Sequence, residues 1–299
     1  MPELPEVETM VRGLRPALLG KTIRSIEVRD EFLLQGCTKR SLERRAAGAT
    51  VAVVERRGKW VAISLGRDAG IIVIQPRMTG GFWLVPPVRP EQARLIFHVE
   101  GVTKTVWFCD ARRLGKIAWY PSASDAQAAF ARSQGPDALE IVEGELRERL
   151  GRTGRGVKAA LMDQKLVAGI GNIYADEILF RARIHPARVA SGLTRGEIKR
   201  IHQAIRPILD EAIAAEGSSF DAGYRTVLGL EGGFLAQNAV HRRKGGPCPC
   251  CKKPIVKEYI AGLIGRPTYY CPNCQPTGDG NGGNGASGSS GRSGRDSVS

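Results

Sequence analysis

Four cysteines near the C-terminal end constrain the fold more than any other feature of this sequence. Cys248 and Cys251 are separated by two residues, as are Cys271 and Cys274, and 19 residues lie between the pairs. This spacing is typical of a site in which four thiolates bind one tetrahedral zinc ion. About thirty residues cannot build a sufficient hydrophobic core, so the ion would replace it. The sequence therefore predicts a four-cysteine zinc ribbon over residues 246–275.

The other cysteines are not predicted to be ligands. The two-residue gap selects Cys248 over Cys250, which we interpret as a spare thiol. Cys37 and Cys109 are interpreted as plain small residues. Because five of the seven cysteines lie between positions 248 and 274, a metal site is favoured over disulfides, as expected in a reducing compartment.

Short runs of β-branched residues, broken by glycine, proline and charged residues, follow the first twenty residues. Such runs with partial alternation are typical of an antiparallel sandwich. Strands are predicted over residues 22–28, 50–55, 60–65, 71–75, 95–99, 105–109 and 116–119. Together with an opening helix and a second helix near residues 41–47, they predict an N-terminal antiparallel β-sandwich with flanking helices over residues 1–133.

The pattern becomes helical after residues 133–137, which marks a domain boundary. Helices are predicted over residues 143–150, 158–164, 173–182 and 194–216, and Pro207 should kink or shorten the last one. They form a helical domain over residues 138–245, and a cleft between two domains could hold a large ligand. The Gly/Ser-rich tail, residues 276–299, has no apolar content to bury and is predicted to be disordered. The predicted fold class is multidomain α+β.

The charge of the chain favours a polyanionic partner. There are 44 Lys and Arg residues against 30 Asp and Glu residues, which gives a formal net charge of +14. The charges of the tail cancel, so the whole excess belongs to residues 1–275. Net charge alone does not separate DNA from RNA or acidic lipid. The sequence has no run of 18 apolar residues and no signal-peptide pattern, so we expect a soluble cytoplasmic protein.

The first eight residues, Met-Pro-Glu-Leu-Pro-Glu-Val-Glu, place a proline where removal of Met1 would leave a free secondary amine. A terminal amine has a lower pKa than a lysine side chain, so more of it is neutral and nucleophilic near pH 7. A helix beginning here would favour the neutral amine, whereas Glu3, Glu6 and Glu8 would favour the cation. The alternative interpretation is an ordinary helix start, where proline and acidic residues are common.

This opening resembles that of the formamidopyrimidine-DNA glycosylase family, which are bacterial base-excision enzymes. The sister endonuclease VIII group typically begins Pro-Glu-Gly-Pro-Glu, so Leu4 favours the first group. The resemblance implies that Pro2 attacks the C1′ carbon of the sugar and that Glu3 protonates the ribose ring oxygen. It also implies that Glu6 shapes the lesion site.

Three loops of the N-terminal domain continue the resemblance. Residues 56–59, Arg-Arg-Gly-Lys, resemble a turn whose lysine, here Lys59, reaches phosphate and lesion in the active site. Residues 77–80, Arg-Met-Thr-Gly, imply that Met78 fills the gap left by a flipped base. Residues 110–115 resemble Asp-Pro-Arg-Arg-Phe-Gly, which implies that Arg112 bonds the orphaned cytosine. Leu114 stands where most relatives have a wedging phenylalanine, so it has no ring to stack. Taken alone, a turn lysine usually faces solvent and a lone methionine usually packs in a core.

The helical domain and the ribbon carry further motifs. Residues 158–164 and 166–177 resemble the family's helix-two-turn-helix, in which Lys158 would contact a phosphate. The glycines of Val-Ala-Gly-Ile-Gly-Asn would let backbone amides approach a phosphate, and Asn172 would cap the next helix and join the DNA-binding site. Arg266 matches an arginine that grips the phosphate beside the lesion. Residues 240–243, Val-His-Arg-Arg, stand where Val-Tyr-Gly-Arg is usual, so His241 replaces a tyrosine. Residues 217–224 occupy the region of a lesion-capping loop.

The resemblance spans residues 2–275 and implies a bifunctional DNA glycosylase and AP lyase. Such an enzyme removes 8-oxoguanine and formamidopyrimidines from duplex DNA through a Schiff base on Pro2 and β,δ-elimination. It would act as a monomer on the nucleoid, and zinc would have no part in the chemistry. Two alternatives stay open: an endonuclease VIII-like specificity for oxidised pyrimidines, and a catalytically weak protein that binds damaged DNA.

No histidine pairs with a serine or cysteine in a recognisable hydrolase pattern, and His98 and His185 are interpreted as structural.

Overall fold

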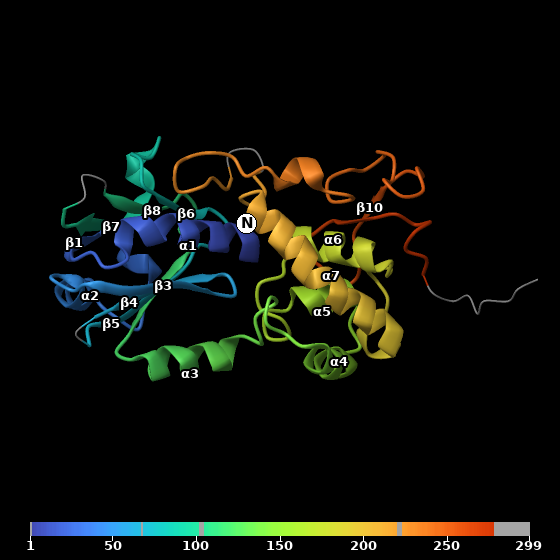
Figure 1. The fold of residues 1–299 in the computed structure, drawn as a ribbon, viewed down its shortest axis with the longest axis horizontal. Helices are drawn as coiled ribbons and strands as arrows, with labels where there is room; N and C mark the ends of the chain where they lie inside the picture. Colours follow the sequence, from blue (N-terminus) through green and yellow to red (C-terminus); the bar gives the residue numbers. More distant parts are fainter. Residues whose placement is uncertain (1, 67, 102–104, 220–222, 278–299) are drawn as a thin grey trace, which may run out of the picture.

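The fold was analysed in a computed structural model that describes residues 2–66, 68–101, 105–219 and 223–277. Figure 1 shows a β-rich half beside a helical half, with the start of helix α1 (Leu4–Leu18) at their junction. None of the helices within the described residues is both long and apolar enough to span a membrane.

The β-rich half contains two sheets that pack around one core. One sheet has the strand order β1-β7-β8-β6 and the other β2-β9-β5-β4-β3. The core between them includes Val54, Ile72, Phe97 and Phe108. The strands are β1 (Ile23–Val28), β2 (Leu34–Gln35), β3 (Val51–Arg57), β4 (Trp60–Leu65), β5 (Gly70–Gln75), β6 (Gly80–Trp83), β7 (Ala93–Val99), β8 (Val106–Asp110) and β9 (Lys116–Tyr120).

Every strand predicted in this half is present, with ends shifted by at most two residues. Strands β2 and β6 were not predicted, because β2 has two residues and β6 begins with two glycines. The predicted antiparallel pairing has one exception among the described strands, since Leu34 of β2 pairs with Ile117 of β9 in parallel. Helix α2 (Lys39–Ala46) lies near its predicted place, whereas the alanine-rich helix α3 (Ala123–Ser133) was not predicted.

Helix α1 contributes to the cores of both halves. Val7, Met10, Val11 and Leu14 pack into the core of the sandwich, whereas Leu4 belongs to the core of the helical half. The helix therefore fixes its first residues at the junction of the two halves.

The helical half consists of α4 (Glu143–Gly151), α5 (Val157–Met162), α6 (Asn172–Ala182) and α7 (Arg195–Ala214). Short 3-10 turns occur in the β-rich half at Glu31–Leu33 and Pro90–Gln92, and after α6 and α7 at Ala190–Gly192 and Phe234–Gln237. Pro207 was predicted to kink or shorten the last helix, and the shortening is wrong, because α7 continues through it for two further turns. Pro207 is exposed, so water can satisfy the carbonyl that loses its partner. Buried Ile205, Ile208 and Leu209 hold the helix on either side.

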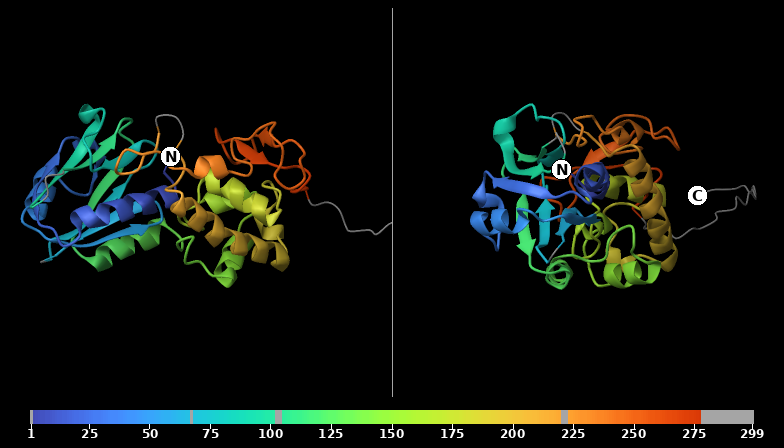
Figure 2. Two further views of the ribbon diagram at one scale, coloured as in Figure 1. Left: turned by 45° about the horizontal axis from the view of Figure 1, so that its top comes forward. Right: turned by 60° about the vertical axis from the view of Figure 1, so that its left-hand side comes forward.

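The C-terminal hairpin, β10 (Val256–Glu258) and β11 (Thr268–Tyr270), pairs in antiparallel fashion. Ile255 and Tyr269 share a small core with Phe180 of α6 and with Val240. Figure 2 shows the hairpin on the helical half, at the far end from the sandwich. Contact with α6 therefore fixes the place of the hairpin. The predicted disordered tail falls almost wholly at residues 278–299, which lie outside the described residues.

Candidate active site

The carboxylates of the first turn are buried at the junction of the two halves. Pro2 is buried, and Glu3 and Glu6 are 2% and 1% exposed. Glu6 accepts hydrogen bonds from the Glu3 backbone N–H at 2.8 Å, the Tyr174 hydroxyl at 2.5 Å and the Ser218 backbone N–H at 2.8 Å. Burial raises the pKa of Glu6, the nearby Glu3 raises it further, and these hydrogen bonds oppose the rise. Glu6 thus connects α1, α6 and the segment after α7.

The Glu3 carboxylate lies at the N-terminus of α6. Its Oε1 accepts a hydrogen bond from Ile173 N at 2.9 Å and its Oε2 a longer one from Tyr174 N at 3.5 Å. A carboxylate is stabilised there by the helix dipole and by the backbone N–H groups that have no partner within the helix. The hydrogen bond between Glu3 and Ile173 therefore fixes the start of α1 against the start of α6.

Two glycines make this approach possible. A Cβ atom on Gly171 would lie 2.3 Å from Cδ of Glu3, and one on Gly169 would lie 2.5 Å from Cδ1 of Leu4. In this structure the predicted phosphate-binding glycines therefore make room for α1. The cap predicted at Asn172 is wrong, because Gly171 holds the cap position and the Asn172 amide donates to the Pro267 carbonyl at 3.2 Å.

Lys59 lies at the turn between β3 and β4 and is 8% exposed. Its ammonium group donates to the Ile170 carbonyl at 2.8 Å. Burial lowers the pKa of Lys59 to about 8; Glu3 and Glu6 oppose this shift, and Arg266 adds to it. Lys59 therefore interacts electrostatically with groups from two distant parts of the sequence, the first turn of α1 and the hairpin that carries Arg266.

The turn that carries Lys59 is braced by residues that the sequence analysis missed. Arg56 forms an ion pair with Asp137 in the segment between the halves, and a second with Glu8 of α1 at 3.1 Å. Asp137 also accepts a hydrogen bond from Gly58 N at 3.0 Å. These contacts fix the turn against both α1 and the interdomain segment.

A second buried carboxylate joins the loops that carry Met78 and Arg112. Asp110 is fully buried, and it accepts hydrogen bonds from the Thr79 hydroxyl at 2.5 Å and Gly115 N at 2.6 Å. Met78 and Leu114 are 40% and 37% exposed, and Arg112 is exposed. The three predicted base-contacting side chains therefore lie on two joined loops of the sandwich.

Lys158 differs from its predicted role. Its side chain is 0% exposed and pairs with Asp176 at 2.8 Å. It also donates to Thr268 Oγ1 at 2.9 Å and to the Pro267 carbonyl at 3.1 Å. The ammonium therefore donates two hydrogen bonds to the hairpin and lies at ion-pair distance from Asp176, and in this structure the buried side chain has no accessible surface for the predicted phosphate contact. Arg266, the next residue before Pro267, is exposed.

The four predicted ligand cysteines converge at the base of the hairpin. The Sγ atoms of Cys248, Cys251, Cys271 and Cys274 all lie within 4.8 Å of one another. Cys248 and Cys274 are 3.8 Å apart, and Cys251 and Cys271 are 3.4 Å apart. Four thiolates at about 2.3 Å from one tetrahedral ion would be about 3.8 Å apart. The cluster therefore fits a metal ion.

Local patterns could not identify the residues that support these groups. Asp137, Tyr174 and Asp176 act on partners more than 80 residues away in the sequence. One signal was present: two adjacent carboxylates, Asp176 and Glu177, interrupt a run of mostly apolar residues from Ile173 to Phe180, and buried carboxylates need partners. The expected lesion-capping loop includes residues 220–222, which lie outside the described residues.

Two family models match the chain. The model described as "Formamidopyrimidine-DNA glycosylase N-terminal domain" matches residues 1–117, and the "Formamidopyrimidine-DNA glycosylase H2TH domain" matches residues 134–222. Formamidopyrimidine-DNA glycosylase of Thermus thermophilus is 40% identical over 93% of this chain and 100% of the relative. The Bacillus subtilis protein of the same name is 37% identical over 92% of this chain and 99% of the relative.

Solved structures give the same result. The crystal structure of MutM (Fpg) from Thermus thermophilus matches with a TM-score of 0.80 and 38% identity, over 92% of this chain and 98% of that one. The Lactococcus lactis Fpg bound to DNA with an abasic site matches with a TM-score of 0.82 and 30% identity, over 92% and 99% of the two chains. Sequence and fold agree over nearly the whole length, and the chain belongs to the formamidopyrimidine-DNA glycosylase family.

Proposed function

We propose that this protein is a bifunctional DNA glycosylase and AP lyase that removes oxidised purines from duplex DNA. The observation that carries the proposal is that Pro2 is buried next to Glu3, whose carboxylate binds the N-terminus of α6, and that buried Lys59 donates to Ile170 just before this helix. Relatives of known structure are complexes with Fapy-dG DNA and with carbocyclic 8-oxo-G DNA, which supports 8-oxoguanine and formamidopyrimidines as substrates. The protein acts as a monomer in the cytoplasm, where bacterial DNA lies.

Pro2 becomes the nucleophile once Met1 is removed. Its nitrogen lone pair bonds to C1′, and the electron pair of the glycosidic bond leaves with the base, which takes up a proton. Glu3 protonates the ribose ring oxygen, the C1′–O4′ bond breaks, and an iminium ion joins nitrogen to C1′. Burial of Pro2 favours the neutral, nucleophilic amine.

The iminium ion then acts as an electron sink. Loss of the C2′ proton expels the 3′ phosphate, a second elimination expels the 5′ phosphate, and water releases Pro2. Extrusion of the nucleotide costs a few kcal/mol of unstacking. Met78 and Leu114 fill the gap, Arg112 bonds the opposite base, and Lys59 and Arg266 hold phosphate, so that binding offsets this cost.

The metal ion is proposed to be zinc, bound by Cys248, Cys251, Cys271 and Cys274. Four thiolates without an open position are typical of a structural zinc site. The ion stabilises the hairpin that carries Arg266 and takes no part in bond breaking.

Incision assays test the proposal. The mature protein should cleave a duplex with 8-oxoguanine opposite cytosine, leaving phosphate at both ends of the gap. Pro2→Gly should abolish cleavage. Glu3→Gln should slow base removal about 10²-fold or more, yet still cleave a preformed abasic site, because that sugar already opens to an aldehyde.

The two alternatives predict different outcomes in the same assay. Faster cleavage of a duplex with an oxidised pyrimidine would establish the endonuclease VIII-like specificity. Tight binding to every lesion without incision would establish the catalytically weak damage-binding protein and overturn the proposal.

A further inference from the structure

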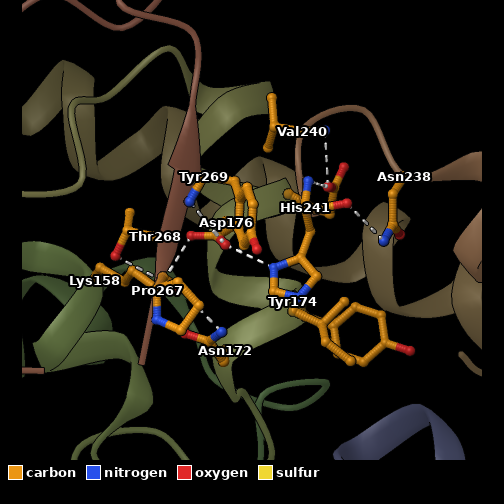
Figure 3. Close-up of polar contacts among 12 residues, drawn as sticks. Lys158, Asn172, Tyr174, Asp176, Asn238, Val240, His241, Pro267, Thr268 and Tyr269 are labelled. Carbon is orange, nitrogen blue, oxygen red and sulfur yellow. Dashed lines mark hydrogen bonds and ion pairs between the residues drawn. The ribbon is translucent and has the colours of Figure 1, made fainter. Parts of the chain in front are cut away.

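Three charged or titratable side chains form a buried row beneath the hairpin. Asp176 of α6 lies between Lys158 of α5 and His241, as Figure 3 shows. The Lys158 ammonium is 2.8 Å from Asp176 Oδ1, and His241 Nδ1 is 2.7 Å from Asp176 Oδ2. The side chains of Lys158 and Asp176 are 0% exposed and that of His241 is 6% exposed.

This row binds the backbone directly after Arg266. The Pro267 carbonyl accepts hydrogen bonds from Lys158 at 3.1 Å and from the Asn172 amide at 3.2 Å. The backbone N–H of Tyr269 donates to Asp176 at 3.2 Å. Residues 267–269 are therefore held by α5 and α6 rather than only by the pairing of β10 with β11, as Figure 3 also shows.

His241 is itself held firmly. The adjacent carboxylate of α6, Glu177, accepts backbone hydrogen bonds from Ala239, Val240 and His241 at 2.7, 3.0 and 2.8 Å. The His241 ring packs edge-on against the Tyr269 ring, with centroids 5.0 Å apart. His241 thus contacts the hairpin both directly and through Asp176.

A buried ion pair is a poor source of stability, because desolvation offsets the attraction between its charges. Separating the two partners is nevertheless costly, because each charge would then be buried without compensation. A buried ion pair therefore restricts the relative positions of the segments that carry it. A row of this kind is suited to fixing the position of a neighbouring segment.

We propose that Lys158, Asp176 and His241 are positioning residues for Arg266, and that they act on DNA only through this arginine. The proposal rests on the proposed function, in which Arg266 contacts the phosphate beside the lesion. Histidine at position 241 replaces the tyrosine usual in the resembling motif and supplies a ring N–H to Asp176.

A double-mutant cycle tests this proposal. Affinity is measured by fluorescence anisotropy on the zinc-loaded protein, with a duplex containing a tetrahydrofuran abasic analogue, so that no catalysis is needed. Arg266→Ala should weaken binding about tenfold or more, and the negative slope of log affinity against log salt should become shallower by about one. Lys158→Met should also weaken binding and make this slope shallower, but it should have no further effect in the Arg266→Ala background.

The matched control is Lys199→Met, which removes an exposed lysine of α7 and should leave affinity and slope unchanged. Additive losses from Lys158→Met and Arg266→Ala would show that Lys158 has its own phosphate contact and would overturn the proposal. An unchanged affinity in Lys158→Met would overturn it as well. Failure of incision by the parent protein would instead count against the proposed function.

A second pair of variants covers the case in which Lys158→Met does not fold. His241→Asn keeps a side-chain N–H near the position of Nδ1, whereas His241→Leu removes it, and both lose the contact with Tyr269. Affinity should fall more in His241→Leu than in His241→Asn, and the difference should vanish in the Arg266→Ala background. Equal affinities, or a difference that persists without Arg266, would contradict the proposal.

Discussion

Lys59 shows how a single residue can be unfavourable for folding and yet suited to function. At neutral pH its ammonium group is charged, although the side chain is 8% exposed. Burial of a cation is costly unless nearby charges compensate for it. Glu3 and Glu6 provide part of this compensation. The folded protein bears the rest of the desolvation cost, and the buried ammonium group of Lys59 thereby keeps its positive charge where a DNA phosphate is proposed to bind.

This cost makes stability depend on pH. The pKa of Lys59 is about 8 in the folded protein against 10.5 as its ordinary value. The unfolded chain binds more protons between these values, so the penalty is complete below pH 8 and disappears as the pH rises towards 10.5.

Lys59→Met should therefore raise the melting temperature at pH 7, and this gain should shrink between pH 8 and pH 10. The Ile170 carbonyl would keep a donor, because the Gln164 amide also binds it at 2.8 Å. Thermal melts at several pH values check this, with exposed Lys165→Met as the control. A gain that is the same at every pH would show that relief of a buried charge is not its cause.

At the scale of elements, the N-terminus of α6 organises the site. Its first amides receive the Glu3 carboxylate, and Gly171 leaves the room for it. The backbone of Gly171 is extended, with φ −132° and ψ −152°, so alanine is allowed by conformation and is opposed only by contact with Glu3.

Gly171→Ala should displace Glu3 and lower base excision strongly, while binding to an abasic analogue changes little. Gly144→Ala is the matched control, since a Cβ there meets nothing within 4 Å; it should leave activity intact and stabilise α4 by up to about 1 kcal/mol. Single-turnover excision and anisotropy separate the two effects. Normal excision by Gly171→Ala would mean that the contact between Glu3 and α6 is dispensable.

The elements themselves were largely predictable from the sequence, but their partners were not. The alternation in residues 60–65 predicted β4 at its observed bounds, and the four cysteine positions predicted the cluster. The burial of Lys158 was not predictable, because Asp176, the Pro267 carbonyl and the Thr268 hydroxyl meet it only in the folded chain. The local sequence predicted Asn172 as a helix cap, but Gly171 occupies the cap position and the Asn172 amide donates to the Pro267 carbonyl.

At the scale of the molecule, the proposed DNA contacts come from two separate parts of the fold. Met78, Arg112 and Leu114 lie on the sandwich, whereas Arg266 lies on the hairpin fixed to α6. The excess of positive charge is suited to such a distributed interface. The hairpin depends on its cysteines, because its small core includes Cys248 and Cys271.

Removal of zinc should therefore abolish tight DNA binding while the sandwich stays folded. The sandwich core includes none of the four ligand cysteines, so near-ultraviolet circular dichroism of the aromatic residues should persist in large part after chelation. Affinity is measured by anisotropy before chelation, after it, and after zinc is restored. Undiminished affinity of the metal-free protein would contradict the role given to the hairpin.

The central claim is that residue 2 becomes covalently bonded to the sugar of the damaged nucleotide. Borohydride reduction during reaction with a duplex containing 8-oxoguanine opposite cytosine, followed by peptide mass spectrometry, tests it most directly. The account predicts a stable adduct on Pro2 in protein that has lost Met1, and none in protein that retains it. An adduct on another residue, such as Lys59, or incision without any trapped adduct would contradict the account.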